Sequence, residues 1–99
     1  MFVSMNQNTC LLYNRVNDVY DRLKLFCIEK GFVVKETHEE FYFIRAKKTS
    51  FFLWKNMRLE FEILTVEKNK VQVTSRIYKF GFRQPKLEKQ YCIAIENLF

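Results

Sequence analysis

The segment from Phe41 to Lys79 alternates apolar and charged residues, and this alternation restricts the fold more than any other feature of the chain. Successive side chains of a β-strand point to opposite faces of the sheet. In the clearest block, one face carries Met57, Leu59, Phe61 and Ile63, and the other carries Arg58, Glu60 and Glu62. The pattern predicts an antiparallel sheet with one buried face and one solvent-exposed face.

The blocks of alternation predict a meander of four to five strands. We expect strands at residues 32–35, 41–46, 57–66 and 71–78, with 51–54 as a continuation or a further strand. Polar residues between them predict turns at residues 37–40, 55–56 and 67–70.

Two amphipathic helices are predicted at the ends of this meander. The first spans residues 10–30, with Asn8 or Thr9 as its cap and Gly31 as its stop. Its apolar stripe consists of Leu12, Val16, Val19, Leu23 and Phe26. After a linker at residues 80–85, the second stripe consists of Leu87, Tyr91, Ala94, Ile95 and Leu98.

Both helices can bury their stripes on one face of the sheet, which predicts a single α+β domain. The expected division is a flexible leader at residues 1–8 and one domain at residues 9–99. The 11 Phe, 5 Tyr and 1 Trp are enough to build a small core, since each buried aromatic removes a large area from water.

The formal net charge of +6 is compatible with nucleic acid, an anionic lipid surface or an acidic protein as partner. No run of consecutive Lys or Arg exceeds two, however, which favours an ordinary solvated surface. Three cysteines without a C-x-x-C motif are typical of a reducing compartment. With no signal peptide and no long apolar segment, we expect a cytoplasmic protein without a membrane span.

The sequence offers few residues that could form a catalytic site. His38 is the only histidine and lies in a predicted turn, and Cys27 and Cys92 lie near the helix stripes, where buried inert thiols are common. Glu60 and Glu62 are spaced for a carboxylate pair.

Arg58, which flanks the pair, and Arg76, which faces it from the next strand, more simply neutralise those two carboxylates. We therefore predict a protein that is not an enzyme and that has no catalytic, cofactor-binding or metal-binding residues.

Aromatic residues adjoin basic residues in two segments, Phe51–Lys55 and Tyr78–Arg83. Proteins that bind single-stranded nucleic acid place aromatic platforms beside cations in this way. The competing interpretation is that these aromatics fill the core. The predicted binding surface consists of Lys47, Lys48, Trp54, Lys55, Arg58, Arg76, Lys79 and Arg83.

Residues 44–99 resemble a group of small uncharacterised bacterial domains with a helix, a strand meander and a C-terminal helix. Those domains carry a Trp-Gly-Glu-like turn and a Trp-Gly-Lys-Asn-like segment, and Trp54-Lys55-Asn56 and Phe80-Gly81-Phe82-Arg83 stand at these places. Lys55 replaces the first Gly, and Phe80 replaces the second Trp. The resemblance implies a helix-on-sheet domain like half of the TATA-binding protein or a small helix-grip fold, and implies no activity.

The first functional hypothesis is therefore a non-catalytic binding module that takes a protein partner or an apolar ligand at the sheet and helix surfaces. The alternative is single-stranded nucleic-acid binding through the basic and aromatic surface. An exposed strand edge would also suit a homodimer, and Trp54 and its neighbours would suit a partner or membrane surface. Whether Trp54, Phe51 and Phe52 are core or surface separates these hypotheses.

Overall fold

A computed structural model describes residues 8–38, 42–49 and 56–99 of the chain. The elements, in chain order, are β1 Thr9–Leu12, α1 Val16–Glu29, β2 Val33–His38, β3 Phe43–Lys48, β4 Met57–Glu67, β5 Lys70–Lys79, β6 Phe82–Arg83 and α2 Pro85–Glu96. This confirms the predicted α+β class, with an antiparallel sheet and a helix toward each end of the chain.

Within the described residues the sheet has six strands in the order β1-β5-β4-β3-β2, and β6 also pairs with β5. The four strands β2 to β5 form the predicted meander. The sheet is widened because β1 and β6 pair with β5 at different places, β1 from Thr9 to Leu12 and β6 at Phe82 and Arg83.

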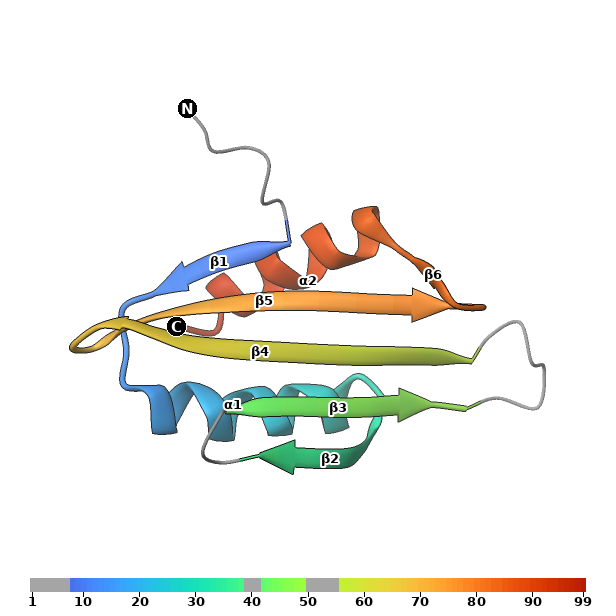
Figure 1. The fold of residues 1–99 in the computed structure, drawn as a ribbon, viewed down its shortest axis with the longest axis horizontal. Helices are drawn as coiled ribbons and strands as arrows, with labels where there is room; N and C mark the ends of the chain where they lie inside the picture. Colours follow the sequence, from blue (N-terminus) through green and yellow to red (C-terminus); the bar gives the residue numbers. More distant parts are fainter. Residues whose placement is uncertain (1–7, 39–41, 50–55) are drawn as a thin grey trace.

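Both helices lie on the same side of the sheet (Figure 1). α1 packs against β2 and β4, and α2 packs against β1 and β5. The ring of Phe26 in α1 lies 6.2 Å from that of Phe61 in β4 and 5.4 Å from that of Tyr91 in α2, so one aromatic residue joins both helices to the sheet. The other side of the sheet, which no described helix covers, is called the open face.

The N-terminal part of the predicted first helix is wrong. Residues 9–12 form β1, which pairs in register with Val71 to Thr74 of β5, and α1 begins only at Val16. Asn8 does not cap a helix, because its side chain donates a hydrogen bond of 2.9 Å to the carbonyl oxygen of Ser75. Cys10 and Leu12 are buried in the core. In the sequence, Leu12 fits the apolar stripe of a helix as well as the buried face of a strand.

Four other expectations need correction or lie outside the described residues. Thr37 and His38 belong to β2 rather than to a turn, and the predicted linker contains β6, because the hairpin after β5 pairs Phe82 with Lys79. The predicted strand at 51–54 and all but Asn8 of the predicted leader lie outside the described residues.

Two positive-φ turns govern how the elements join. Gly31 ends α1 with φ +88°, as predicted, in the left-handed conformation that favours glycine. The hairpin between β5 and β6 has Phe80 at φ +56° and Gly81 at φ +78°. A two-residue hairpin loop with positive φ at both positions normally takes Asn-Gly, so Phe80 occupies a backbone conformation that costs an L-residue about 1 kcal/mol.

Candidate functional site

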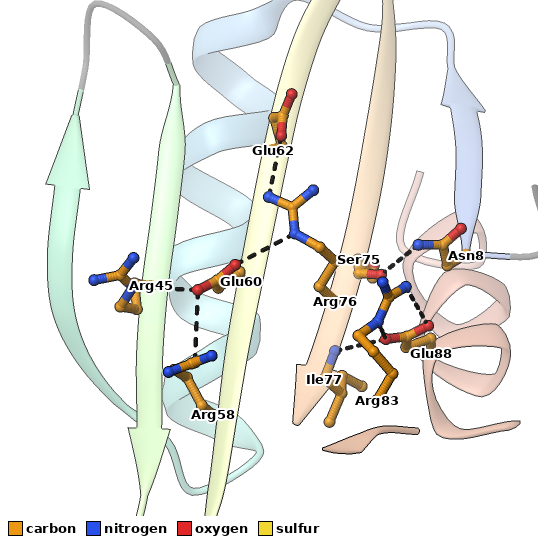
Figure 2. Close-up of polar contacts among 10 residues, drawn as sticks. All are labelled: Asn8, Arg45, Arg58, Glu60, Glu62, Ser75, Arg76, Ile77, Arg83 and Glu88. Carbon is orange, nitrogen blue, oxygen red and sulfur yellow. Dashed lines mark hydrogen bonds and ion pairs between the residues drawn. The ribbon is translucent and has the colours of Figure 1, made fainter. Parts of the chain in front are cut away.

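The middle of the open face holds a network of ion pairs (Figure 2). Glu60 of β4 is 8% exposed and lies between three arginines. Its carboxylate oxygens are 3.3 Å from Arg45 Nε, 3.6 Å from Arg58 Nε and 3.3 Å from Arg76 Nε. One carboxylate therefore positions a guanidinium group from each of three neighbouring strands.

Arg76 connects this network to a second carboxylate. Its terminal nitrogen donates a 3.0 Å hydrogen bond to Glu62. Burial lowers the pKa of Arg76, but its hydrogen bonds to Glu62 and Glu60 outweigh that effect and the pKa is raised. The prediction that Arg58 and Arg76 neutralise the two carboxylates is confirmed.

Toward one end of the open face, the next row of side chains contains cations and an aromatic ring and lacks a carboxylate. Strand pairing places Lys47 of β3 opposite Arg58 of β4, Arg58 opposite Tyr78 of β5, and Tyr78 opposite Arg83 of β6. We call these four residues the cationic row. The guanidinium carbons of Arg58 and Arg83 lie 4.4 and 5.9 Å from the centre of the Tyr78 ring, which orders the middle of the row.

Beside this row lies a pocket of about 250 Å³, here called the end pocket. The described residues that line it are Lys47, Lys48, Thr49, Asn56, Met57, Arg58, Tyr78, Phe80 and Gly81. None of them is Asp or Glu, and three are cationic at neutral pH. The end pocket therefore combines positive charge with aromatic and apolar walls.

The two adjacent lysines of β3 have different roles. Lys48 donates a 3.2 Å hydrogen bond from Nζ to the carbonyl oxygen of Lys30, and Nζ lies 5.8 Å from the ring of Phe32. Lys48 therefore binds the C-terminal end of α1, where a cation is favourable. Lys47 points to the other side of the strand and is exposed, with no ion-pair partner among the described residues.

Two phenylalanines project from the hairpin between β5 and β6. Phe80 is 63% exposed and Phe82 is 73% exposed. Exposed single apolar residues are common on protein surfaces, but Phe80 also occupies an unfavourable backbone conformation at the rim of the end pocket. Strained residues of this kind concentrate at functional sites.

A buried carboxylate holds this hairpin in place. Glu88 of α2 is 1% exposed and accepts hydrogen bonds of 2.8 Å from the backbone N–H of Ile77, 2.6 Å from Arg83 Nε and 2.9 Å from an Arg83 terminal nitrogen (Figure 2). It lies where β1 and β6 leave a gap along the edge of β5. The hydrogen bonds that Arg83 donates to Glu88 raise the pKa of Arg83.

Sequence reasoning missed Glu88. The one feature of the sequence that could have indicated its importance is its position in the first turn of a helix that begins with Pro85. A carboxylate at that position is usually explained by its favourable interaction with the helix dipole alone. Its tertiary role depends on the unpaired edge of β5, which the sequence pattern does not reveal.

The predicted binding residues are therefore brought together only in part. Lys47, Lys48 and Arg58 line the end pocket. Arg76 belongs to the ion-pair network, Arg83 is held by Glu88, and Lys79 is half-buried opposite Phe82. Trp54 and Lys55, and with them the question of core or surface, lie outside the described residues.

The candidate catalytic groups are not assembled into a site in the described residues. Cys10, Cys27 and Cys92 are buried free thiols, and burial raises the pKa of Cys27 to about 12. The described part of the chain contains no group of three or more His, Cys, Asp or Glu that could hold a metal ion. The backbone of His38 lies in β2, and its side chain is not among the described ones.

No protein-family model matches the chain, and no curated protein matches it. The resemblance to small bacterial helix–meander–helix domains therefore stays a prediction.

No helix in the described segments combines the length and apolar character needed to cross a bilayer.

Proposed function

We propose that this protein is a non-catalytic module that binds single-stranded nucleic acid at the end pocket and the adjoining cationic row. The observation that carries the proposal is the composition of the pocket, in which Lys47, Lys48 and Arg58 lie beside Tyr78 and Phe80 without a carboxylate among the described lining residues. Of the two hypotheses drawn from the sequence, this arrangement favours the nucleic-acid alternative.

The physical argument has two parts. Lysine and arginine side chains near a phosphate backbone release its condensed counterions, which drives binding and makes it salt-dependent. Exposed aromatic rings stack on bases whose faces are not covered by neighbours, a contact worth about 1–3 kcal/mol per base. Phe80 offers such a ring at the rim of the pocket, and stacking would repay its backbone cost.

The proposal is tested by the anisotropy of labelled oligo-dT and oligo-U at several salt concentrations. We expect Lys47→Gln to weaken binding and to make the slope of log K against log salt shallower by about 0.7. Lys68→Gln removes the same charge at an exposed position in the hairpin at the opposite end of the sheet, and it should leave both quantities unchanged. Equal effects of the two variants would contradict a site at the end pocket.

A second variant separates binding from folding. Phe80→Asn places a residue that tolerates positive φ at the hairpin turn, so the free energy of unfolding should rise by about 0.5–1 kcal/mol. Loss of the aromatic ring should weaken oligonucleotide binding at least about fivefold. A stabilised variant with unchanged affinity would exclude Phe80 as a stacking residue.

The fluorescence of Trp54 provides a label-free measurement, since it is the only tryptophan and lies two residues from Asn56 of the pocket. Quenching by oligo-dT or oligo-U at low salt is expected. No change in fluorescence together with no change in anisotropy would refute the proposed function.

Self-association is a second candidate role. Leu25 and Ile28 are 57% and 59% exposed on the outer surface of α1, and they could contact a second copy of the chain. The bulge and exposed Lys35 in the edge strand β2 oppose pairing through that edge. Sedimentation over a range of protein concentrations tests this role, and a monomer at all concentrations would exclude it.

We also propose a fold relationship and a cellular location. The likeness to half of the TATA-binding protein or to a helix-grip domain is supported by the layout of two helices on one face of an antiparallel sheet. A cytoplasmic location is supported by the free thiols.

A further inference from the structure

We infer that the bound nucleic-acid chain crosses the strands of the sheet along the cationic row and that the site takes about four nucleotides. This inference rests on the proposed function and adds the path and the length of the ligand. It follows from the order of charges across and along the open face.

The path across the strands is short and nearly free of negative charge. Lys47, Arg58, Tyr78 and Arg83 lie on four successive strands of the sheet, each directly opposite the next. Neighbouring strands are about 4.8 Å apart, so the row is about 14 Å long. A stacked strand advances about 3.4 Å per nucleotide, so about four nucleotides match the row.

The path along β4 meets two carboxylates and then neutral residues. One row inward from the cationic row lies Glu60, and the next row contains Glu62, whose side chain is 41% exposed. Beyond them, Leu64 pairs with Gln72, and Gln72 pairs with Leu11, so the described residues of that row include no cation. A phosphate chain that ran along β4 would pass these carboxylates. One that ran along β5 would pass Arg76, whose guanidinium already binds both carboxylates, and would then meet no cation of that strand before Lys70 at its far end.

The two ends of the row differ in a way that limits the ligand. On the β2 side, Lys47 is followed by Val33, which is neutral and exposed. On the other side, Arg83 is held by Glu88, and Phe80 projects from the adjacent hairpin. Within the described residues, Lys47 is the cation of this row without a carboxylate partner, since Arg58 lies 3.6 Å from Glu60 and Arg83 is bound to Glu88. The row therefore predicts at most three phosphate contacts and a salt slope between about −0.7 and −2.

The experiment measures the affinity of the full chain for oligo-dT of two, four, six and eight nucleotides. Affinity should rise about fivefold or more per nucleotide from two to four. From four to eight nucleotides, the affinity should rise only in proportion to the number of overlapping four-nucleotide positions that the longer ligand offers. A continued steep rise up to eight nucleotides would overturn the crossing path and leave the proposed function intact.

Two variants that add a lysine distinguish the paths directly. Thr49→Lys adds charge at the end pocket and should strengthen binding of the eight-nucleotide ligand by about threefold or more, whereas Gln72→Lys adds the same charge beyond the carboxylates. At 150 mM salt the Debye length is about 8 Å, so Gln72→Lys should change affinity by less than about twofold. Strengthening by Gln72→Lys equal to that by Thr49→Lys would refute the crossing path. Failure of every oligonucleotide to bind would refute the proposed function as well.

Discussion

Replacing Glu88 tests how the hairpin that borders the end pocket is held. In Glu88→Ala the buried backbone N–H of Ile77 loses the carboxylate oxygen that accepts its hydrogen bond, and leaving a buried donor unsatisfied costs about 1–3 kcal/mol. The ion pair with Arg83 is also lost. Because the Arg83 side chain is 45% exposed, solvent screening limits this part to about 1 kcal/mol.

The expected decrease in the free energy of unfolding is therefore about 2–4 kcal/mol for Glu88→Ala. Glu88→Gln retains an oxygen that can accept the Ile77 hydrogen bond and removes only the charge, so we expect a decrease of about 1 kcal/mol. For a chain of 99 residues, the alanine variant should melt about 10–25 °C lower than the wild type.

Urea denaturation followed by circular dichroism measures both variants. Glu96→Ala is the matched control, because it makes the same replacement at an exposed position of the same helix, and surface substitutions usually change stability by less than about 0.5 kcal/mol. A cost below about 1 kcal/mol for Glu88→Ala, or equal costs for alanine and glutamine, would refute the role assigned to the Ile77 hydrogen bond.

Three further predictions concern stability. Gly31→Ala should lower the free energy of unfolding by about 1–2 kcal/mol, because φ is +88° there, and Gly31→Asn should cost less in the same urea titration. Burial raises the pKa of Cys27 from 9.0 to about 12, so the stability that the protonated thiol contributes is complete below pH 9 and is lost as the pH rises toward 12. We therefore expect the free energy of unfolding of Cys27→Ala to fall less between pH 8 and pH 10 than that of the wild type. Equal decreases in the two proteins would contradict this. Leu12→Ala should cost about 2–4 kcal/mol and Leu11→Ala less than about 0.5 kcal/mol, since Leu12 is buried and Leu11 exposed; similar costs would contradict the orientation of β1.

Much of the fold could be predicted from local patterns. The strands predicted at 57–66 and 71–78 are confirmed as β4 and β5 because alternation over that length is incompatible with a helix. The end of α1 at Gly31 is confirmed because few residues other than glycine adopt positive φ without strain.

β1 was missed for a physical reason. Leu12 is spaced correctly for the apolar stripe of a helix that includes Val16 and Val19, and it is also spaced correctly for a strand that includes Cys10. What decides between them is the free edge of β5, which offers hydrogen bonds to residues 9–12. A partner more than fifty residues away leaves no trace in a local pattern.

The candidate site divides in the same way. The sequence shows which residues are basic or aromatic, but it leads us to place Lys47 and Lys48 on one binding surface. The observed strand β3 includes both and puts their side chains on opposite faces. Strand register then sets Lys47, Arg58, Tyr78 and Arg83 in one row, and helix packing brings Glu88 to Arg83. Side-chain chemistry and periodicity are local properties of a chain, whereas contacts between distant segments arise only when the core and the sheet are assembled.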